Sequence, residues 1–194
     1  TIGILLTEDQ NQIIPTILSR SQVVLYLEDE VTSFINHLLD NQVDNQKAYY
    51  LSVLTKDIDT ALNILDDPNF DLAIKLFNQI ISYFENPKLP LSLIFTSMEQ
   101  AFINDKAWIS FIFELTTLFL LDVVHIHMNQ KIFFEFLKEN IMQVTTKFDV
   151  KKATSIINLI HEAILNLRLP INLSLRLQAL SIQIERQINN VKHS

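Results

Sequence analysis

The sequence contains a single glycine, Gly3, among 194 residues. Folds rich in strands and tight loops use glycine wherever the backbone turns with positive φ or passes close to a ligand. A chain with one glycine therefore favours α-helices joined by short polar turns. The same scarcity excludes glycine-rich phosphate loops, because those loops need backbone that approaches the phosphate closely.

Composition narrows the class of protein further. Hydrophobic residues make up 48% of the chain, enough to form the core of one large domain or two small ones. The chain has no cysteine. This excludes disulfides, thiolate metal sites and cysteine nucleophiles, and it agrees with a cytoplasmic location. No basic stretch precedes an apolar run at the start of the sequence, so we expect no signal peptide.

Charge is distributed unevenly along the chain. Residues 1–88 carry 13 acidic and 5 basic side chains, which gives a net charge of −8. Residues 89–194 carry 9 acidic and 10 basic side chains, which gives a net charge of +1. Neither half is a basic platform for nucleic acid, and the acidic half would repel a phosphate backbone. We therefore expect any contact with DNA to be made through a partner.

Residues 1–27 differ in pattern from the rest of the chain. Residues 2–6 and 22–27 are short apolar, β-rich runs of the kind that form buried strands, and we expect a short helix or a turn around Pro15 between them. No further strand pattern follows. We therefore expect these residues to be the last part of an α/β domain.

Helical spacing of apolar residues dominates from residue 31 onward. It predicts four helices before residue 86, the second of them over 45–54. Five more are predicted near 90–103, 105–128, 131–147, 150–168 and 173–191. Asn172 is the expected N-cap of the last helix. Pro87 and Pro90 interrupt the pattern where the charge balance also changes, so we place a domain boundary there.

Residues 107–124 are apolar for long enough to raise the question of a membrane span. A polar stripe at helical spacing argues against it, and its members are Lys106, Ser110, Glu114 and Thr117. A carboxylate in mid-span costs roughly 2.5–3.5 kcal/mol on insertion scales. We therefore expect a buried bundle helix with the only tryptophan, Trp108, in the core.

The remaining polar residues do not combine into a catalytic or metal site. His125 and His127 lie two residues apart on a predicted helix, so they point to different faces and cannot easily bind one metal ion together. The same holds for His161 and its neighbour Glu162. We expect them at the surface or at helix ends. The acidic runs Asp66–Asp67 and Glu28–Glu30 are interpreted as helix caps. No complete catalytic constellation is found, so the sequence does not predict an enzyme.

Residues 5–24, LLTEDQNQIIPTILSRSQVV, resemble the end of the AAA+ module in bacterial clamp-loader subunits. In that family a strand ending in Thr-Glu leads through Leu/Ile-Pro-Thr-Ile to Ser-Arg-Cys-Gln. Pro15, Thr16, Ser19 and Arg20 match this motif, and Ser21 replaces its cysteine. Arg20 is also the only basic residue among the first 46.

The resemblance is greatest to the delta-prime subunits of DNA polymerase III. The tau and gamma motor subunits carry a nucleotide-sensing lid motif with Gly and Arg, whereas residues 55–62 here contain neither. Delta subunits generally lack the Ser-Arg element, and delta-prime subunits keep it without binding nucleotide. Residues 172–174 before a leucine-rich helix weakly resemble the family's final collar helix, with Leu180 in place of its usual Glu.

The resemblance implies a largely all-α chain, a C-terminal part of such a subunit. Residues 1–27 would be the remnant of an AAA+ domain, 28–86 a small helical lid and 87–194 a five-helix collar for oligomerisation. The partners would be tau/gamma and delta subunits, with the sliding clamp and DNA contacted through the complex. No cofactor, metal or membrane is implied, and the location would be cytoplasmic.

The family mechanism gives Arg20 a role in trans. It would act as an arginine finger toward ATP bound by a neighbouring motor subunit, because a guanidinium matches phosphate oxygens with a planar fork of donors. Two alternatives remain open. The chain could be part of a motor subunit, which an upstream phosphate loop would reveal. It could also be an unrelated helical interaction module, which would not associate with clamp-loader subunits.

Overall fold

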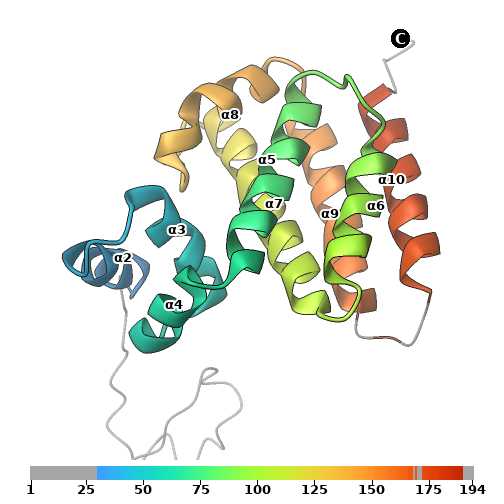
Figure 1. Cartoon of the computed structure of the whole chain (residues 1–194). Coiled ribbons are helices and arrows are strands. Elements are labelled where there is room, and N and C mark those ends of the chain that lie inside the picture. The colour runs from blue at the N-terminus through green and yellow to red at the C-terminus, as the bar shows by residue number, and fades with distance from the viewer. Residues whose placement is uncertain (1–29, 168, 170–171, 190–194) are drawn as a thin grey trace, which may run out of the picture.

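The computed structural model describes residues 30–167, 169 and 172–189 (Figure 1). This part of the chain is α-helical and contains no strand, so the predicted all-α class is confirmed for it. The predicted strands within residues 1–27 lie outside the described residues. The elements are α2 Glu30–Asp40, α3 Asn45–Leu54, α4 Ile58–Leu65, α5 Pro68–Glu85, α6 Leu91–Phe102, α7 Lys106–His127, the 3-10 helix η2 Glu135–Leu137, α8 Lys138–Thr145, α9 Val150–Leu167 and α10 Leu173–Asn189.

Most helices begin at an aspartate or asparagine whose side chain accepts hydrogen bonds from first-turn N–H groups. The aspartates are Asp44, Asp57, Asp67, Asp105 and Asp149. Asp67 is followed by Pro68, whose fixed φ and missing N–H suit the first helical position. Asn172 caps α10 by accepting from the Leu175 N–H at 3.2 Å. The capping roles predicted for Asp67 and Asn172 are confirmed.

Two helices end in a left-handed residue, and neither residue is glycine. Gln42 has φ 64° after α2, and Asn129 has φ 54° after α7. At the first end, the Val43 N–H donates to the Leu38 carbonyl, the 6→1 bond of a Schellman motif. The chain therefore makes its left-handed helix ends with side chains that tolerate this backbone less well than glycine does.

Helix α7 is the centre of the bundle. It packs against α5, α8 and α9, and it also contacts α3 and α6. Helix α10 packs against α6 and α9 at the far side of the bundle, while α2, α3 and α4 group beside the N-terminal half of α5 (Figure 1). Trp108 on α7 is 8% exposed, so its predicted core position is confirmed.

An aromatic cluster joins the N-terminal helices to the bundle. Tyr50 of α3 meets Phe77 of α5 and Phe136 of η2 edge-on, with ring centroids 5.9 and 5.5 Å apart. The fully buried Phe134 lies against both Tyr50 and Phe77. Such pairs add roughly 0.5–1.5 kcal/mol each beyond the burial of area. The cluster therefore holds α3, α5 and the segment after α7 together.

The segment after α7 differs from the sequence expectation of one helix over residues 131–147. Residues 131–134 are not helical, and η2 and the eight-residue α8 follow them. The cause is Asp122 of α7, whose carboxylate accepts the Phe133 N–H at 2.7 Å and the Phe134 N–H at 2.8 Å. These bonds hold the backbone against α7 in a non-helical path, so the helix begins later.

The domain boundary placed at Pro87 remains a prediction. Residues 86–90 form a non-helical connector between α5 and α6, as the prolines require. Helix α5, however, lies before this boundary and buries Phe70, Phe77 and Phe84 in a core shared with α6, α7 and α8. The described residues therefore pack as one continuous core across the connector.

Candidate assembly surface

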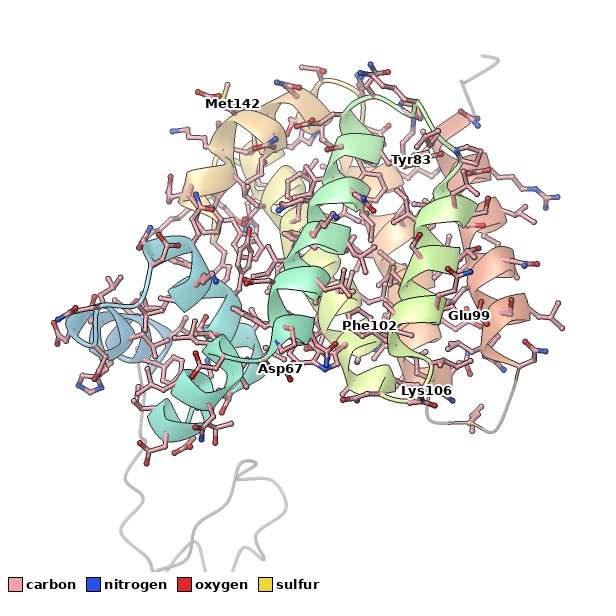
Figure 2. All side chains as sticks on the ribbon, in the orientation of Figure 1. Asp67, Tyr83, Glu99, Phe102, Lys106 and Met142 are labelled. Atoms are coloured by element: carbon pink, nitrogen blue, oxygen red, sulfur yellow. The ribbon has the colours of Figure 1, made fainter. Side chains whose placement is uncertain are left out.

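The residues that carry the family resemblance, Pro15, Thr16, Ser19 and Arg20, lie outside the described residues. Their geometry, including any approach of Arg20 to a phosphate, therefore remains a prediction. The described helices carry the side chains of the candidate assembly surface. Figure 2 displays these side chains on the ribbon.

The histidines of α7 lie at the C-terminal end of that helix, as predicted. The Nε2 of His127 lies 2.7 Å from the Phe148 carbonyl, to which it donates in the matching tautomer. The Nδ1 of His125 lies 3.6 Å from the Asp122 carboxylate, which is 1% exposed. Burial raises the pKa of Asp122, while the Phe133 and Phe134 N–H groups and His125 oppose that rise. Among the described residues, no three His, Asp or Glu side chains gather to hold a metal ion.

Helix α6 begins without a side-chain cap of its own. Pro90 stands at the N-cap position and offers no acceptor. The acceptor comes instead from Glu185 of α10, whose Oε1 receives the Leu91 N–H at 2.8 Å. This bond places the start of α6 beside the C-terminal half of α10, so the two helices run antiparallel along one side of the bundle (Figure 1).

The outward faces of these two helices form a surface that we call the α6–α10 face. Its exposed residues on α6 are Leu93, Ser97, Gln100 and Ala101, and those on α10 are Leu175, Gln178, Ala179, Ile182, Gln183 and Arg186. Leu175 is 65% exposed and Ile182 is 48% exposed. Arg186 is the only charged member. Depletion of charge and exposure of large apolar side chains are features of the cores of protein interfaces.

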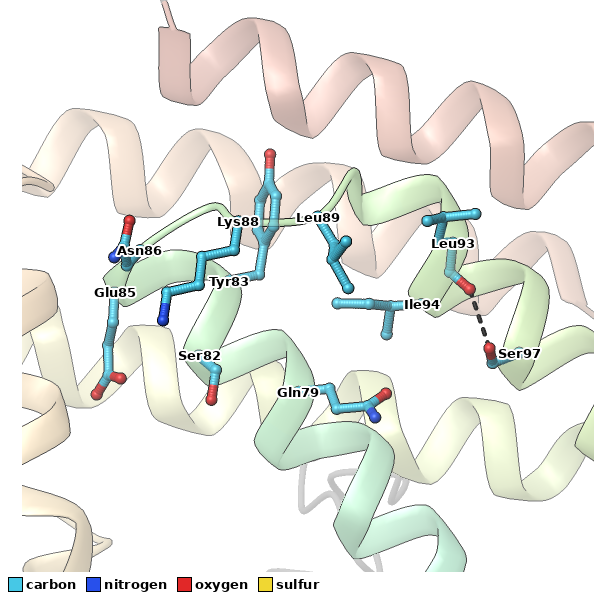
Figure 3. Close-up of a pocket in the computed structure, with 10 residues that line it drawn as sticks. All are labelled: Gln79, Ser82, Tyr83, Glu85, Asn86, Lys88, Leu89, Leu93, Ile94 and Ser97. Carbon is cyan, nitrogen blue, oxygen red and sulfur yellow. Dashed lines mark hydrogen bonds between the residues drawn. The ribbon is translucent and has the colours of Figure 1, made fainter.

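A groove of about 450 Å³ runs beside this face, between the end of α5 and the start of α6 (Figure 3). Leu89, Leu93 and Ile94 line it from the connector and α6, and Ser82 and Tyr83 from α5. Leu89 is 64% exposed, so an apolar side chain stands at the edge of the groove. The groove extends the apolar surface of the α6–α10 face toward α5.

The charged residues that line this groove are Glu85 and Lys88, and Tyr83 adds no charge to it. Burial, and secondarily the negative charge of Glu185, raise the pKa of Tyr83 to about 12. The hydroxyl is therefore neutral at physiological pH. At the end of α5, Glu85 accepts a hydrogen bond from Asn140 at 2.6 Å, and its backbone carbonyl accepts one from Lys147. Glu85 and Lys147 are thus held by partners within the bundle.

The predicted polar stripe on α7 is confirmed as its partly exposed side. Lys106, Ser110 and Glu114 line a cleft of about 460 Å³ between α3, α7 and α9. Lys106 donates to the Leu167 carbonyl at the end of α9 at 3.4 Å, and Ser110 lies 3.2 Å from Glu114. These bonds pair the three stripe residues that line the cleft, whereas the buried Thr117 hydroxyl has no hydrogen-bond partner among the described residues.

Helix α7 is also the one described helix with the length and apolarity to cross a membrane, and 61% of its most apolar window is buried inside the protein. This burial agrees with the predicted bundle helix. The structure thus gives the apolar side chains of α7 protein neighbours: α5, α8 and α9.

Sequence reasoning missed two residues that shape this site. Glu185 lies 94 positions from the N–H that it caps, and the only sequence signal was that α6 lacks an Asp, Asn, Ser or Thr at its start. Asp122 stands within an apolar run, where a lone carboxylate signals a buried hydrogen-bonding role.

Comparison of the chain with protein-family models, with curated proteins and with solved structures gives no match. The described residues define a helical bundle with a charge-depleted outer face, and no metal-binding cluster is found among them.

Proposed function

We propose that the chain is a non-catalytic subunit of a bacterial clamp loader, of the delta-prime type, which assembles with ATPase subunits to load the sliding clamp during DNA replication. The observation that carries the proposal is the order of residues 14–22, IPTILSRSQ, which couples a proline turn to a Ser-Arg pair as in that family. A continuous series of helices from residue 30 onward agrees with the lid and collar of such subunits.

The α6–α10 face is the assembly surface in this proposal. Its exposed Leu175 and Ile182 would be buried by a neighbouring subunit, and its lack of charge keeps the desolvation cost of that contact low. Arg20 would reach the ATP of a neighbour once the subunits are docked. Because the guanidinium acts only in the assembled ring, the subunit needs no nucleotide site of its own.

The test is assembly with clamp-loader subunits from the same source. The full-length protein, tau/gamma and delta are mixed, and the complex is measured by size-exclusion chromatography with light scattering. Ile182→Glu should weaken assembly by about 10-fold or more, because it buries a charge in an apolar contact. Met142→Glu is the matched control, since Met142 is 54% exposed on α8, away from the α6–α10 face.

Normal assembly of the wild type and of Met142→Glu, with loss in Ile182→Glu, would support the proposal. A wild-type protein that forms no complex with any of these subunits would refute the clamp-loader function. Equal assembly of all three proteins would leave the function standing and remove the α6–α10 face as the surface that provides it.

A further inference from the structure

Helices α9 and α10 pack side by side and leave a groove of about 180 Å³ between them. Its floor is apolar and includes Phe113, which is 1% exposed, and Leu177, which is 3% exposed. Its polar lining residues are Glu162, Asn166, Arg176 and Gln183. The groove therefore combines a small apolar floor with three side chains that can donate hydrogen bonds and one carboxylate.

Arg176 is half-buried, and its Nε has no partner in this groove. Its Nε is buried and makes no hydrogen bond within the described part of the chain. No described carboxylate lies within 4.0 Å of its guanidinium, Glu162 included. A buried donor without an acceptor costs roughly 1–3 kcal/mol, and more when the group is charged. Within the described residues, the free protein therefore leaves one buried N–H of this guanidinium without an acceptor.

Three lysines of the bundle are paired with backbone carbonyls within the chain. Lys106 donates to the Leu167 carbonyl, Lys147 to the Glu85 carbonyl and Lys152 to the Ile188 carbonyl. All three bonds lie at the C-terminal ends of helices, where a positive charge is favourable. Arg176 instead stands in the first turn of α10, where the helix dipole disfavours a cation. An anion beside Arg176 would remove both unfavourable terms.

The surroundings of the groove indicate what carries that anion. Leu165, Leu169 and Leu175 are 58%, 45% and 65% exposed around this end of the α9–α10 pair. A free inorganic anion would leave these side chains in water. A carboxylate on an amphipathic helix would pair with Arg176 and cover the leucines together, so the observations favour a protein partner with an acidic residue among apolar ones.

We propose that the α9–α10 groove receives an Asp or Glu side chain from an amphipathic helix of a neighbouring subunit, with its carboxylate paired to Arg176. This inference rests on the proposed assembly of the chain with clamp-loader subunits. The planar guanidinium can bind both carboxylate oxygens, which fixes the orientation of the partner helix as well as its affinity.

The test compares Arg176→Gln with Lys151→Gln in the full-length protein, using isothermal titration calorimetry with the tau/gamma and delta subunits. Lys151 is the control, because it is an exposed cation on α9 that neither lines the groove nor belongs to the α6–α10 face. Arg176→Gln should weaken binding about 10- to 100-fold, whereas Lys151→Gln should change it less than about 3-fold. Arg176→Lys should restore part of the affinity.

Two further readouts separate a pairing role from a structural one. Affinity of the wild type should fall more steeply with salt than that of Arg176→Gln, because the variant lacks the ion pair. Thermal unfolding of the free protein should be unchanged or slightly raised in Arg176→Gln, because Arg176 is unpaired there. A photoreactive residue at position 166, which lines the groove and lies outside the α6–α10 face, should cross-link to a partner peptide that contains Asp or Glu.

Equal binding by Arg176→Gln and Lys151→Gln, or a cross-linked peptide without an acidic residue, would overturn the inference while leaving the proposed function intact. Self-association lost in Arg176→Gln, with subunit binding unaffected, would overturn it in favour of a second copy of the chain. A wild-type protein that binds none of the subunits would overturn the proposed function and this inference together.

Discussion

Replacement of Asp122 by alanine tests how the segment after α7 is held. The Asp122 carboxylate is 1% exposed and accepts the Phe133 and Phe134 N–H groups at 2.7 and 2.8 Å. Asp122→Ala leaves both backbone donors without their acceptor, and the bond to Phe134 is fully buried. The aromatic cluster around Phe134 would lose its anchor to α7.

The magnitude follows from these two bonds. Each unsatisfied buried donor costs roughly 1–3 kcal/mol, and relief of the buried charge returns part of that sum. We expect Asp122→Ala to lower the free energy of unfolding by about 3 kcal/mol at neutral pH. For a chain of this size, that corresponds to a fall in Tm of roughly 6–12 °C. Asp122→Asn keeps one acceptor and should lie between the wild type and Asp122→Ala.

The assay is urea unfolding followed by circular dichroism, with the melting temperature measured in parallel. Asp40→Ala is the control, because Asp40 is exposed at the end of α2 and should change stability by no more than about 0.5 kcal/mol. If Asp122→Ala unfolded at the same urea concentration as Asp40→Ala, the two hydrogen bonds would not hold this segment, and the explanation for the late start of α8 would be wrong.

Three further predictions follow from the same structure. Burial raises the pKa of Asp122 above its ordinary 3.8, so the folded state binds this proton more tightly than the unfolded state does. The free energy of unfolding of the wild type should therefore fall relative to that of Asp122→Asn as pH rises from 3.8 through the native pKa. Urea unfolding at a series of pH values tests this, and the same pH dependence in both proteins would contradict it. Gln42→Gly should raise the free energy of unfolding by about 0.5–1 kcal/mol, because Gln42 has a positive φ that glycine adopts without strain. Asn129→Gly should raise it by less, because asparagine tolerates a positive φ better than glutamine does. A lower melting temperature for Gln42→Gly would contradict this explanation. A chain of residues 66–194 should unfold cooperatively, whereas residues 87–194 should not, because the second lacks the buried face of α5; equally sharp thermal transitions would instead favour the predicted boundary at Pro87.

The helices could be predicted from the sequence because three local signals agree. Apolar spacing, aspartate caps and proline breaks coincide, and the helix over 45–54 has the bounds that were predicted for it. Asp67 with Pro68 is the clearest start signal, since cap and first helical residue are adjacent. The scarcity of glycine also predicted the all-α class, which is confirmed for the described residues.

Contacts between distant residues could not be predicted in this way. The hydrogen bonds that the Phe133 and Phe134 N–H groups donate to Asp122 join residues that local periodicity would assign to two separate helices. The pattern over 131–147 therefore predicted too long a helix. The cap that Glu185 provides for α6 depends on how the helices pack, and no window of sequence contains both partners. The unpaired state of Arg176 likewise depends on which carboxylates the fold brings near it.

The measurement that tests the proposed function most directly is the DNA-stimulated ATPase of a reconstituted clamp loader carrying Arg20→Ala. Assembly, followed by light scattering, should be unchanged, because the α6–α10 face and not Arg20 would supply that contact. ATP turnover and clamp loading should fall by 10-fold or more, since an arginine finger contributes about 10³–10⁵-fold in other phosphoryl-transfer systems. Arg20→Lys should recover only part of the activity. A complex that assembles with Arg20→Ala and retains wild-type ATPase and clamp loading would contradict the role assigned to the Ser-Arg motif.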